Sequence, residues 1–281
     1  MGTIKRSRKS NNNLGPKCSS RKKFINVAMI NIRSVNNKVT NLCESISSKH
    51  IDICCITETW VYEGDTSIYS EIRNRGFKFL NQPRLRKKGG GVGILTKQNI
   101  KIQQTNVYPF NTFEHLLISC SLMSTNHKYI FCTIYRTGLL SSDGRLEFLK
   151  EFETLLTQLE EKNEPAIILG DFNFHISDDN DKAFKEFMDL MESFGFVQLI
   201  CDPTHILGQT LDLLFVKTPD LISELTIYNE SNDVLLSDHF LVNFKLLAQA
   251  SLTKRKVEYR CRNIKSMYLN QFSNDLFYKL N

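Results

Sequence analysis

Short apolar runs that end in polar residues are the feature of this sequence that most limits its fold. Ile51–Ile56 is mostly apolar and is followed at once by polar residues that include Glu58. A short run that is apolar at nearly every position predicts a strand buried on both faces. Pro165–Leu169 and Leu211–Val216 repeat the pattern. We therefore predict sheets that are covered on both sides.

Longer segments carry the apolar spacing of helices. Apolar residues recur at helical intervals in 36–50, 145–162 and 181–194. Between the first two of these segments, 77–135 holds several short β runs separated by Gly, Pro, Asn and Ser, which is typical of an antiparallel meander. Strands that alternate with helices favour two sheets flanked by helices, an α/β sandwich.

The charges divide the chain into three parts. Residues 1–23 hold eight Lys or Arg and no acid, which predicts a disordered basic arm, and 249–281 read as a basic C-terminal linker. The remaining residues, 24–248, hold 21 basic and 28 acidic residues, a net charge of −7, and are long enough for one domain. Attraction to nucleic acid must then come from the tails, from the basic run at 84–88 and from bound cations. A solvated surface or a localisation signal is the alternative reading of each basic run.

Cysteine usage and hydropathy limit the compartment. The eight Cys residues are scattered without metal-ligand spacing, which suits a reducing compartment. No apolar stretch approaches the roughly 18 residues that a membrane span needs. We expect an intracellular protein that has no membrane contact.

Polar residues that could take part in catalysis or metal binding lie where the apolar runs end. Each is ambiguous alone, because a strand-end Glu is usually a surface or capping residue and an Asp-x-Asn after Gly is usually turn chemistry. A buried Asp212 needs a partner, and His239 is available. What is specific is their joint order along the chain: Asn31, Glu58, Gly170-Asp171-Phe172-Asn173, Asp212 and Ser237-Asp238-His239.

This order resembles the endonuclease/exonuclease/phosphatase family, which includes deoxyribonuclease I, and the resemblance covers about residues 24–246. Within the family the chain looks most similar to the endonucleases of non-long-terminal-repeat retrotransposons. The matching motifs are Asn31–Ser34, Thr57–Trp60, Gly89–Val92, Tyr135-Arg136, Gly170–His175, Pro203–His205 and Thr210–Asp212. The resemblance implies a deoxyribonuclease I-like fold, a four-layer α/β sandwich with two mixed sheets packed face to face. Abasic-site specificity is doubtful, because the repair branch carries a short polar or acidic residue where this chain has Arg33.

The resemblance also implies roles for individual residues. Mg²⁺, with Mn²⁺ as an alternative, is expected at three residues: Asn31, Glu58 and Asp238. Substrate contacts are expected from five residues: Asn173, Tyr135, Arg136, Arg86 and Lys87. His175 and His205 are further candidates for facing DNA.

Catalysis is expected to divide among Asp171, Asn173, Tyr135 and an Asp212–His239 pair. Asp212 would orient His239, and Asp171 would position or deprotonate the attacking water. Whether Asp171 or His239 is the general base stays open from sequence.

The implied function is a metal-dependent endonuclease that nicks target DNA for retrotransposition. Such a protein is expected to act in the nucleus as a monomer, with a reverse transcriptase either in trans or in a longer product. Two alternatives remain: a catalytically inactive retrotransposon-derived domain that binds nucleic acid or protein, and a phosphatase of inositol phosphates or lipids on the same fold.

Overall fold

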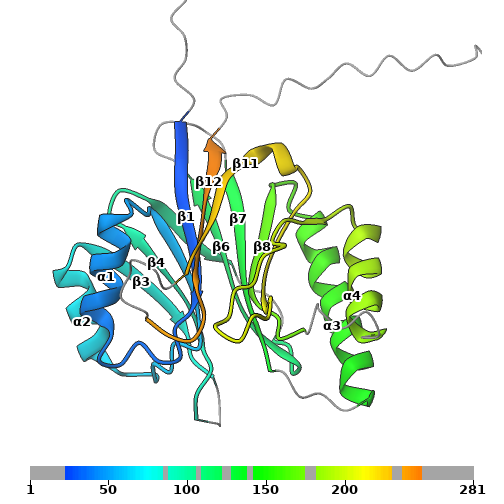
Figure 1. The fold of residues 1–281 in the computed structure, drawn as a ribbon, viewed down its shortest axis with the longest axis horizontal. Coiled ribbons are helices and arrows are strands. Elements are labelled where there is room, and N and C mark those ends of the chain that lie inside the picture. Colours follow the sequence, from blue (N-terminus) through cyan, green and yellow to red (C-terminus); the bar gives the residue numbers. More distant parts are fainter. Residues whose placement is uncertain are drawn as a thin grey trace, which may run out of the picture. The chain divides into compact units, whose positions relative to one another are not determined.

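The computed structural model describes residues 23–84, 88–105, 109–121, 128–137, 142–174, 182–229 and 236–248. The chain divides into two compact units, Met1–Ala250 and Ser251–Asn281. All described residues lie in the first unit. The described part contains two six-stranded sheets and four α-helices (Figure 1).

The first sheet has the strand order β11-β12-β1-β2-β4-β3. Only β1 and β2 are parallel, and they lie at its centre. β2 is buried at every position, as its apolar run predicted. The strands of this sheet are β1 (Lys23–Asn31), β2 (Ile53–Thr57), β3 (Phe77–Gln82), β4 (Val92–Lys97), β11 (Ile222–Tyr228) and β12 (Leu241–Ala248).

The second sheet has the order β5-β6-β7-β8-β10-β9, and its central pair, β7 and β8, is again the only parallel one. Both sheets are therefore mixed, with the parallel pair in the middle. The strands are β5 (Lys101–Thr105), β6 (Phe113–Ser121), β7 (Lys128–Arg136), β8 (Ala166–Asp171), β9 (Val197–Gln198) and β10 (Asp212–Val216).

Three apolar clusters separate four layers. The central cluster joins the facing sides of both sheets and includes Met29, Phe131 and Phe244. A second cluster lies between the first sheet and the helices α1 and α2, and a third lies between the other sheet and α3 and α4 (Figure 1). The helices are α1 (Val39–Ser48), α2 (Thr66–Asn74), α3 (Ser142–Glu160) and α4 (Lys182–Ser193), with a short 3-10 turn η1 at Pro219–Leu221. The expected four-layer α/β sandwich is confirmed.

Two sequence expectations need correction. The β runs of 77–135 are not one meander, because the chain leaves the first sheet after β4 and enters the second at β5. Helix α2 was not predicted, since it spans only nine residues and buries only Ile68 and Ile72. Two buried positions give too weak a periodic signal to mark a helix.

None of the described helices is long and apolar enough to cross a membrane.

Candidate active site

The two central parallel pairs bring their carboxyl ends to one site. In the first sheet Asn31 ends β1 in register with Thr57 at the end of β2, and Glu58 follows directly. In the second sheet Tyr135 is in register with Asp171, which ends β8. Because the sheets pack face to face, residues far apart in sequence meet across the sandwich.

Asn31 forms the link between the sheets. Its Nδ2 donates to Glu58 Oε1 at 2.9 Å and to Asp171 Oδ2 at 2.8 Å, and the side chain is fully buried. Its Oδ1 accepts the Arg33 main-chain N–H at 3.1 Å. The amide nitrogen thus faces the carboxylates, so Asn31 positions Glu58 and Asp171. Its expected role as a metal ligand stays a prediction.

Glu58 is held from several sides. Trp60 Nε1 donates to its Oε2 at 3.1 Å, and the Tyr135 hydroxyl bonds to its carboxylate. Burial raises the pKa of Tyr135, and the negative charges of Glu58 and Asp171 raise it further, so the phenol stays a hydrogen-bond donor. Glu58 has a φ of +53°, which a non-glycine residue adopts only when its surroundings hold it there.

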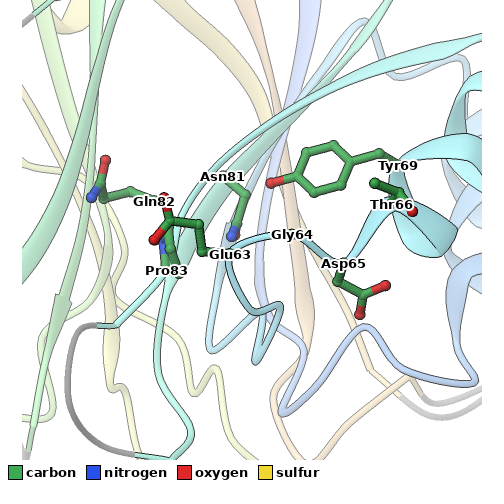
Figure 2. A pocket seen from close by; sticks show the side chains of 8 residues that line it. All are labelled: Glu63, Gly64, Asp65, Thr66, Tyr69, Asn81, Gln82 and Pro83. Atoms are coloured by element: carbon green, nitrogen blue, oxygen red, sulfur yellow. The ribbon is translucent and has the colours of Figure 1, made fainter.

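The side chain of Asn81 holds the loop that follows β2. Its Oδ1 accepts the Thr59 hydroxyl at 2.7 Å, and its Nδ2 donates to the Val61 carbonyl at 3.3 Å. Figure 2 shows the Tyr69 hydroxyl directed toward Asn81, beside a pocket of about 500 Å³. These contacts fix the loop that carries Glu58 to β3.

Asp171 is a buried carboxylate at the centre of the site. Its side chain is 1% exposed, and its Oδ1 accepts the Asn173 N–H at 3.0 Å. Burial first, and then the charge of Asp212, raise the pKa of Asp171 well above its ordinary value. The preceding Gly170 has a φ of +139°, and a Cβ there would clash with the Ile134 carbonyl, so the Gly-Asp order follows from close strand approach.

Asp212 and His239 form a buried pair. His239 Nδ1 lies 2.8 Å from Asp212 Oδ2, and their side chains are 6% and 3% exposed. Burial lowers the pKa of His239, but the charge and hydrogen bond of Asp212 outweigh it and raise the pKa to about 9. The imidazole is therefore protonated at neutral pH. Thr204 Oγ1 accepts the main-chain N–H of Asp212 at 3.1 Å, which fixes the strand start.

Asp238 lies beside this pair, next to Arg33 and His205. Its Oδ2 pairs with Arg33 Nη1 and lies 3.3 Å from His205 Nε2. Burial raises the pKa of Asp238, yet the positive charges of Arg33 and His239 together hold it below its ordinary value. Ser237 Oγ donates to the Asn31 carbonyl, which holds the Asp238 turn against the end of β1.

Glu58 and Asp238 offer the carboxylate oxygens that a hard divalent cation takes as ligands. Asp238 Oδ1 is buried and has no hydrogen-bond partner among the described residues. A buried carboxylate oxygen without such a partner is available as a cation ligand. The Ser237 bond places the Asp238 turn next to Asn31, which holds Glu58.

Two further clusters bring candidate ligand atoms within 4.8 Å of one another among the described residues: Asp171, Asp212 and His239, and His205, Asp238 and His239. Hydrogen bonds explain both. His239 Nδ1 bonds Asp212, and His205 Nδ1 accepts the Leu207 N–H at 3.2 Å, so the His205 proton is on Nε2 and points to Asp238. His205 therefore contacts Asp238, whereas the sequence made it a candidate for facing DNA.

The expected substrate residues divide into three groups. Tyr135 and Asn173 lie at the site, and Asn173 Nδ2 donates to the Arg136 carbonyl at 2.6 Å. Arg136 is 4% exposed and donates to the carbonyls of Phe172 and Asn173, so it holds the loop that follows Asp171 and is poorly placed for direct phosphate contact. The third group, Arg86, Lys87 and His175, lies outside the described residues.

Comparison with known proteins identifies the family. The profile described as "Endonuclease/Exonuclease/phosphatase family" matches residues 25–239. The chain belongs to this family. Family members are hydrolases that act on phosphoester bonds. No curated protein matches the chain in sequence.

Solved structures of this family share the fold. The endonuclease domain of TRAS1, a telomere-specific non-LTR retrotransposon, is 14% identical, with a TM-score of 0.62 over 80% of this chain and 99% of that one. A mannosyl-6-phosphatase of Bacteroides thetaiotaomicron is 14% identical, with a TM-score of 0.58 over 79% and 99%. An AP endonuclease of Archaeoglobus fulgidus is 15% identical, with a TM-score of 0.58 over 80% and 100%. At such identities the likeness concerns the fold, which nucleases and phosphatases share.

Sequence reasoning did not find every residue of the site. Trp60 was noted only as the end of the Thr57–Trp60 motif, yet it donates to Glu58. Thr204 was noted only within a motif, and the contacts of Arg33 and Asp238 could not be read at all. No local pattern encodes these contacts, because each joins segments that are distant in the chain.

Proposed function

We propose that this family member is a metal-dependent endonuclease that hydrolyses DNA phosphodiester bonds and nicks target DNA for retrotransposition. The proposal rests on the position of Asp171, which bonds Asn31, as Glu58 does, and lies beside the buried Asp212–His239 pair. Such a set has the groups that phosphodiester hydrolysis needs: a proton acceptor, a cation for the phosphate and carboxylates for a metal. The fold likeness to a retrotransposon endonuclease domain adds support.

In this mechanism His239 binds the phosphate, and Asp171 accepts a proton from the attacking water. A protonated His239, held by Asp212, is a poor base but a good donor to a non-bridging phosphoryl oxygen. In its ionised form, a carboxylate whose pKa is raised to about 8 is a stronger proton acceptor than an ordinary one. We favour Asp171, in its ionised form, as the general base, because a protonated His239 cannot accept a proton. Asn173 and Tyr135 complete the phosphate contacts.

Glu58 and Asp238 would hold Mg²⁺ or Mn²⁺ when the ion is bound. The ion supplies Lewis-acid stabilisation of the negative charge that develops on the phosphoryl oxygens. Asn31, Trp60 and Tyr135 keep the carboxylate of Glu58 in place for this purpose.

DNA would be bound by a catalytic domain, 24–248, that is itself acidic. Its net charge of −7 opposes a polyanion, so the basic flanks at 1–23 and 249–281 and the bound cations must provide the attraction. We expect a monomer that acts in the nucleus, with a reverse transcriptase in trans or in a longer product.

Supercoiled plasmid provides the decisive assay. Purified protein with Mg²⁺ or Mn²⁺ should convert it to open circles, whereas Asp171→Ala, His239→Ala and a chelator should each abolish the conversion. Lys217→Ala, which removes an ion pair with Glu160 on the helix side of the second sheet, is the control and should nick at the wild-type rate.

Two outcomes would contradict the proposal. Absence of nicking under every divalent metal would instead favour the inactive binding domain. Much faster release of phosphate from an inositol phosphate than cleavage of DNA would favour the phosphatase.

A further inference from the structure

Arg33 places a half-exposed guanidinium beside Asp238 of the site. Its Nη1 pairs with Asp238 Oδ2, and its side chain is 55% exposed while that of Asp238 is 20% exposed. One end of the guanidinium is therefore held by a carboxylate of the site. The rest of it faces solvent, where substrate would arrive.

The main chain around Arg33 is fixed to the same residues that form the site. The Arg33 N–H donates to Asn31 Oδ1 at 3.1 Å, and the Ser34 N–H donates to the Glu58 carbonyl at 2.8 Å. Arg33 and Ser34 have φ values of +45° and +85°, which non-glycine residues adopt at a cost. The loop keeps this conformation because Asn31 and Glu58 hold it, so the position of Arg33 is set by the active site itself.

The donors of Arg33 exceed the acceptors that the described residues offer them. A guanidinium carries five N–H donors, and only the contact with Asp238 is made by its side chain among these residues. The planar fork matches two oxygens of a phosphate. Lys38, the other cation beside this loop, donates to the carbonyls of Ile32 and Arg33 and is thereby occupied.

We propose that Arg33 binds a non-bridging oxygen of the scissile phosphodiester, and that Asp238 positions its guanidinium for this contact. The inference rests on the proposed function, because it adds a substrate-binding cation to that site.

The contact with Asp238 gives Arg33 a second, opposing effect. Glu58 and Asp238 are the carboxylates that fit a divalent cation, and the charge of Arg33 repels a cation at Asp238 and competes for its oxygens. Removal of Arg33 should therefore strengthen metal binding while it weakens substrate turnover. Replacement of a purely structural residue would weaken both metal binding and turnover. Replacement of a residue that only competes with the metal would weaken neither.

The test measures the two effects separately in the full chain. Mn²⁺ binding is followed by electron paramagnetic resonance of the free ion, without substrate. In Arg33→Ala the Mn²⁺ dissociation constant should fall about two- to five-fold, the range expected for loss of a partly exposed ion pair. At saturating Mn²⁺, plasmid nicking by the same variant should fall about ten-fold or more.

Arg33→Lys and Arg75→Ala are the matched variants. Lysine keeps the charge without the fork, so Mn²⁺ affinity should stay near wild type while nicking is intermediate. Arg75 pairs with Glu71 on α2 and contacts none of the site residues, so its loss should change neither readout. Wild-type nicking by Arg33→Ala at saturating metal, or weaker Mn²⁺ binding in that variant, would overturn the proposal.

A failure of the endonuclease function would remain distinguishable. If the wild type nicks no plasmid, turnover of bis(p-nitrophenyl) phosphate replaces nicking as the phosphodiester readout. Equal turnover by wild type and Arg33→Ala at saturating Mn²⁺ would then exclude Arg33 as a phosphodiester ligand, whichever substrate the protein uses.

Discussion

Asp212 lies directly opposite Asp171 in the register of β10 on β8, so two buried carboxylates occupy neighbouring positions of one sheet. Two negative charges in such a setting are unfavourable unless a proton or a cation lies with them. His239 meets this need, because its Nδ1 bonds Asp212 at 2.8 Å. The pair and its proton form the electrostatic centre of the site.

Replacement of Asp212 should return His239 to ordinary behaviour. In Asp212→Asn the pKa of His239 should fall from about 9 toward 6.5, because the charge and the charged hydrogen bond are lost. Plasmid nicking should fall about 100-fold or more. Titration of the His239 ring by NMR checks the first effect, and a pKa that stays near the wild-type value would contradict this account of its cause.

Protonation of His239 should make stability depend on pH. Its pKa is about 9 when folded and 6.5 ordinarily, so the folded state holds the proton more tightly. The resulting contribution, roughly 3 kcal/mol, is fully present below about pH 6.5 and is lost as pH rises through about 9. The raised pKa of Asp171 acts in the same direction, since the folded state also retains that proton. Urea unfolding of metal-free protein across this window should therefore show a falling free energy of unfolding.

The matched variant for the pH effect is His239→Gln, which cannot take up the proton. Its free energy of unfolding should fall less steeply across the same window. An identical slope in both proteins would assign the effect to other groups.

Trp60 should report metal binding at Glu58. It is the only tryptophan, it is 38% exposed, and its Nε1 donates to Glu58 Oε2. A divalent cation on this carboxylate changes the field at the indole, so Trp60 fluorescence should change on addition of Mg²⁺. Glu58→Gln should remove the response, and the control Glu161→Gln, at an exposed position after α3, should keep it. A response that survives Glu58→Gln would place the ion elsewhere.

Arg136 should affect stability more than substrate affinity. Its guanidinium is buried and donates to two carbonyls of the loop that follows Asp171. Lysine cannot reproduce this fork, so Arg136→Lys should lower the free energy of unfolding by about 2–4 kcal/mol. Chemical unfolding measures the loss. A raised KM for DNA without any loss of stability would instead support the direct phosphate contact expected from the resemblance.

The basic arm should contribute affinity without chemistry. Residues 1–23 hold eight Lys or Arg, whereas 24–248 carry a net charge of −7. Deletion of 1–23 should weaken binding to duplex DNA and reduce its salt dependence, because fewer counterions are released. Turnover of bis(p-nitrophenyl) phosphate should be unchanged. Replacement of the eight basic residues by Gln, at full length, should reproduce the deletion if charge is the cause; normal affinity in that variant would refute it.

Sequence patterns predicted the layers of the fold, and the resemblance to a known family supplied the candidate site residues. Mostly apolar runs such as Ile51–Ile56 predicted strands buried on both faces, and Val39, Leu42, Cys43 and Ile46 marked the buried stripe of α1. These signals are local and periodic, so they can be recognised in the sequence without a structure. The weak signal of α2 was lost for the same reason, because two buried residues define no period.

Tertiary structure decided what the site residues do. The fold turns the Asn31 amide nitrogen to Glu58 and Asp171 and buries Arg136 under loop carbonyls, contacts that no sequence pattern indicates. The expected roles of Asn31 in metal binding and of Arg136 in substrate binding stay predictions. The pairing of Arg33 with Asp238 joins residues 205 positions apart. Side-chain direction and such distant contacts depend on how the two sheets meet, and local sequence carries no record of that geometry.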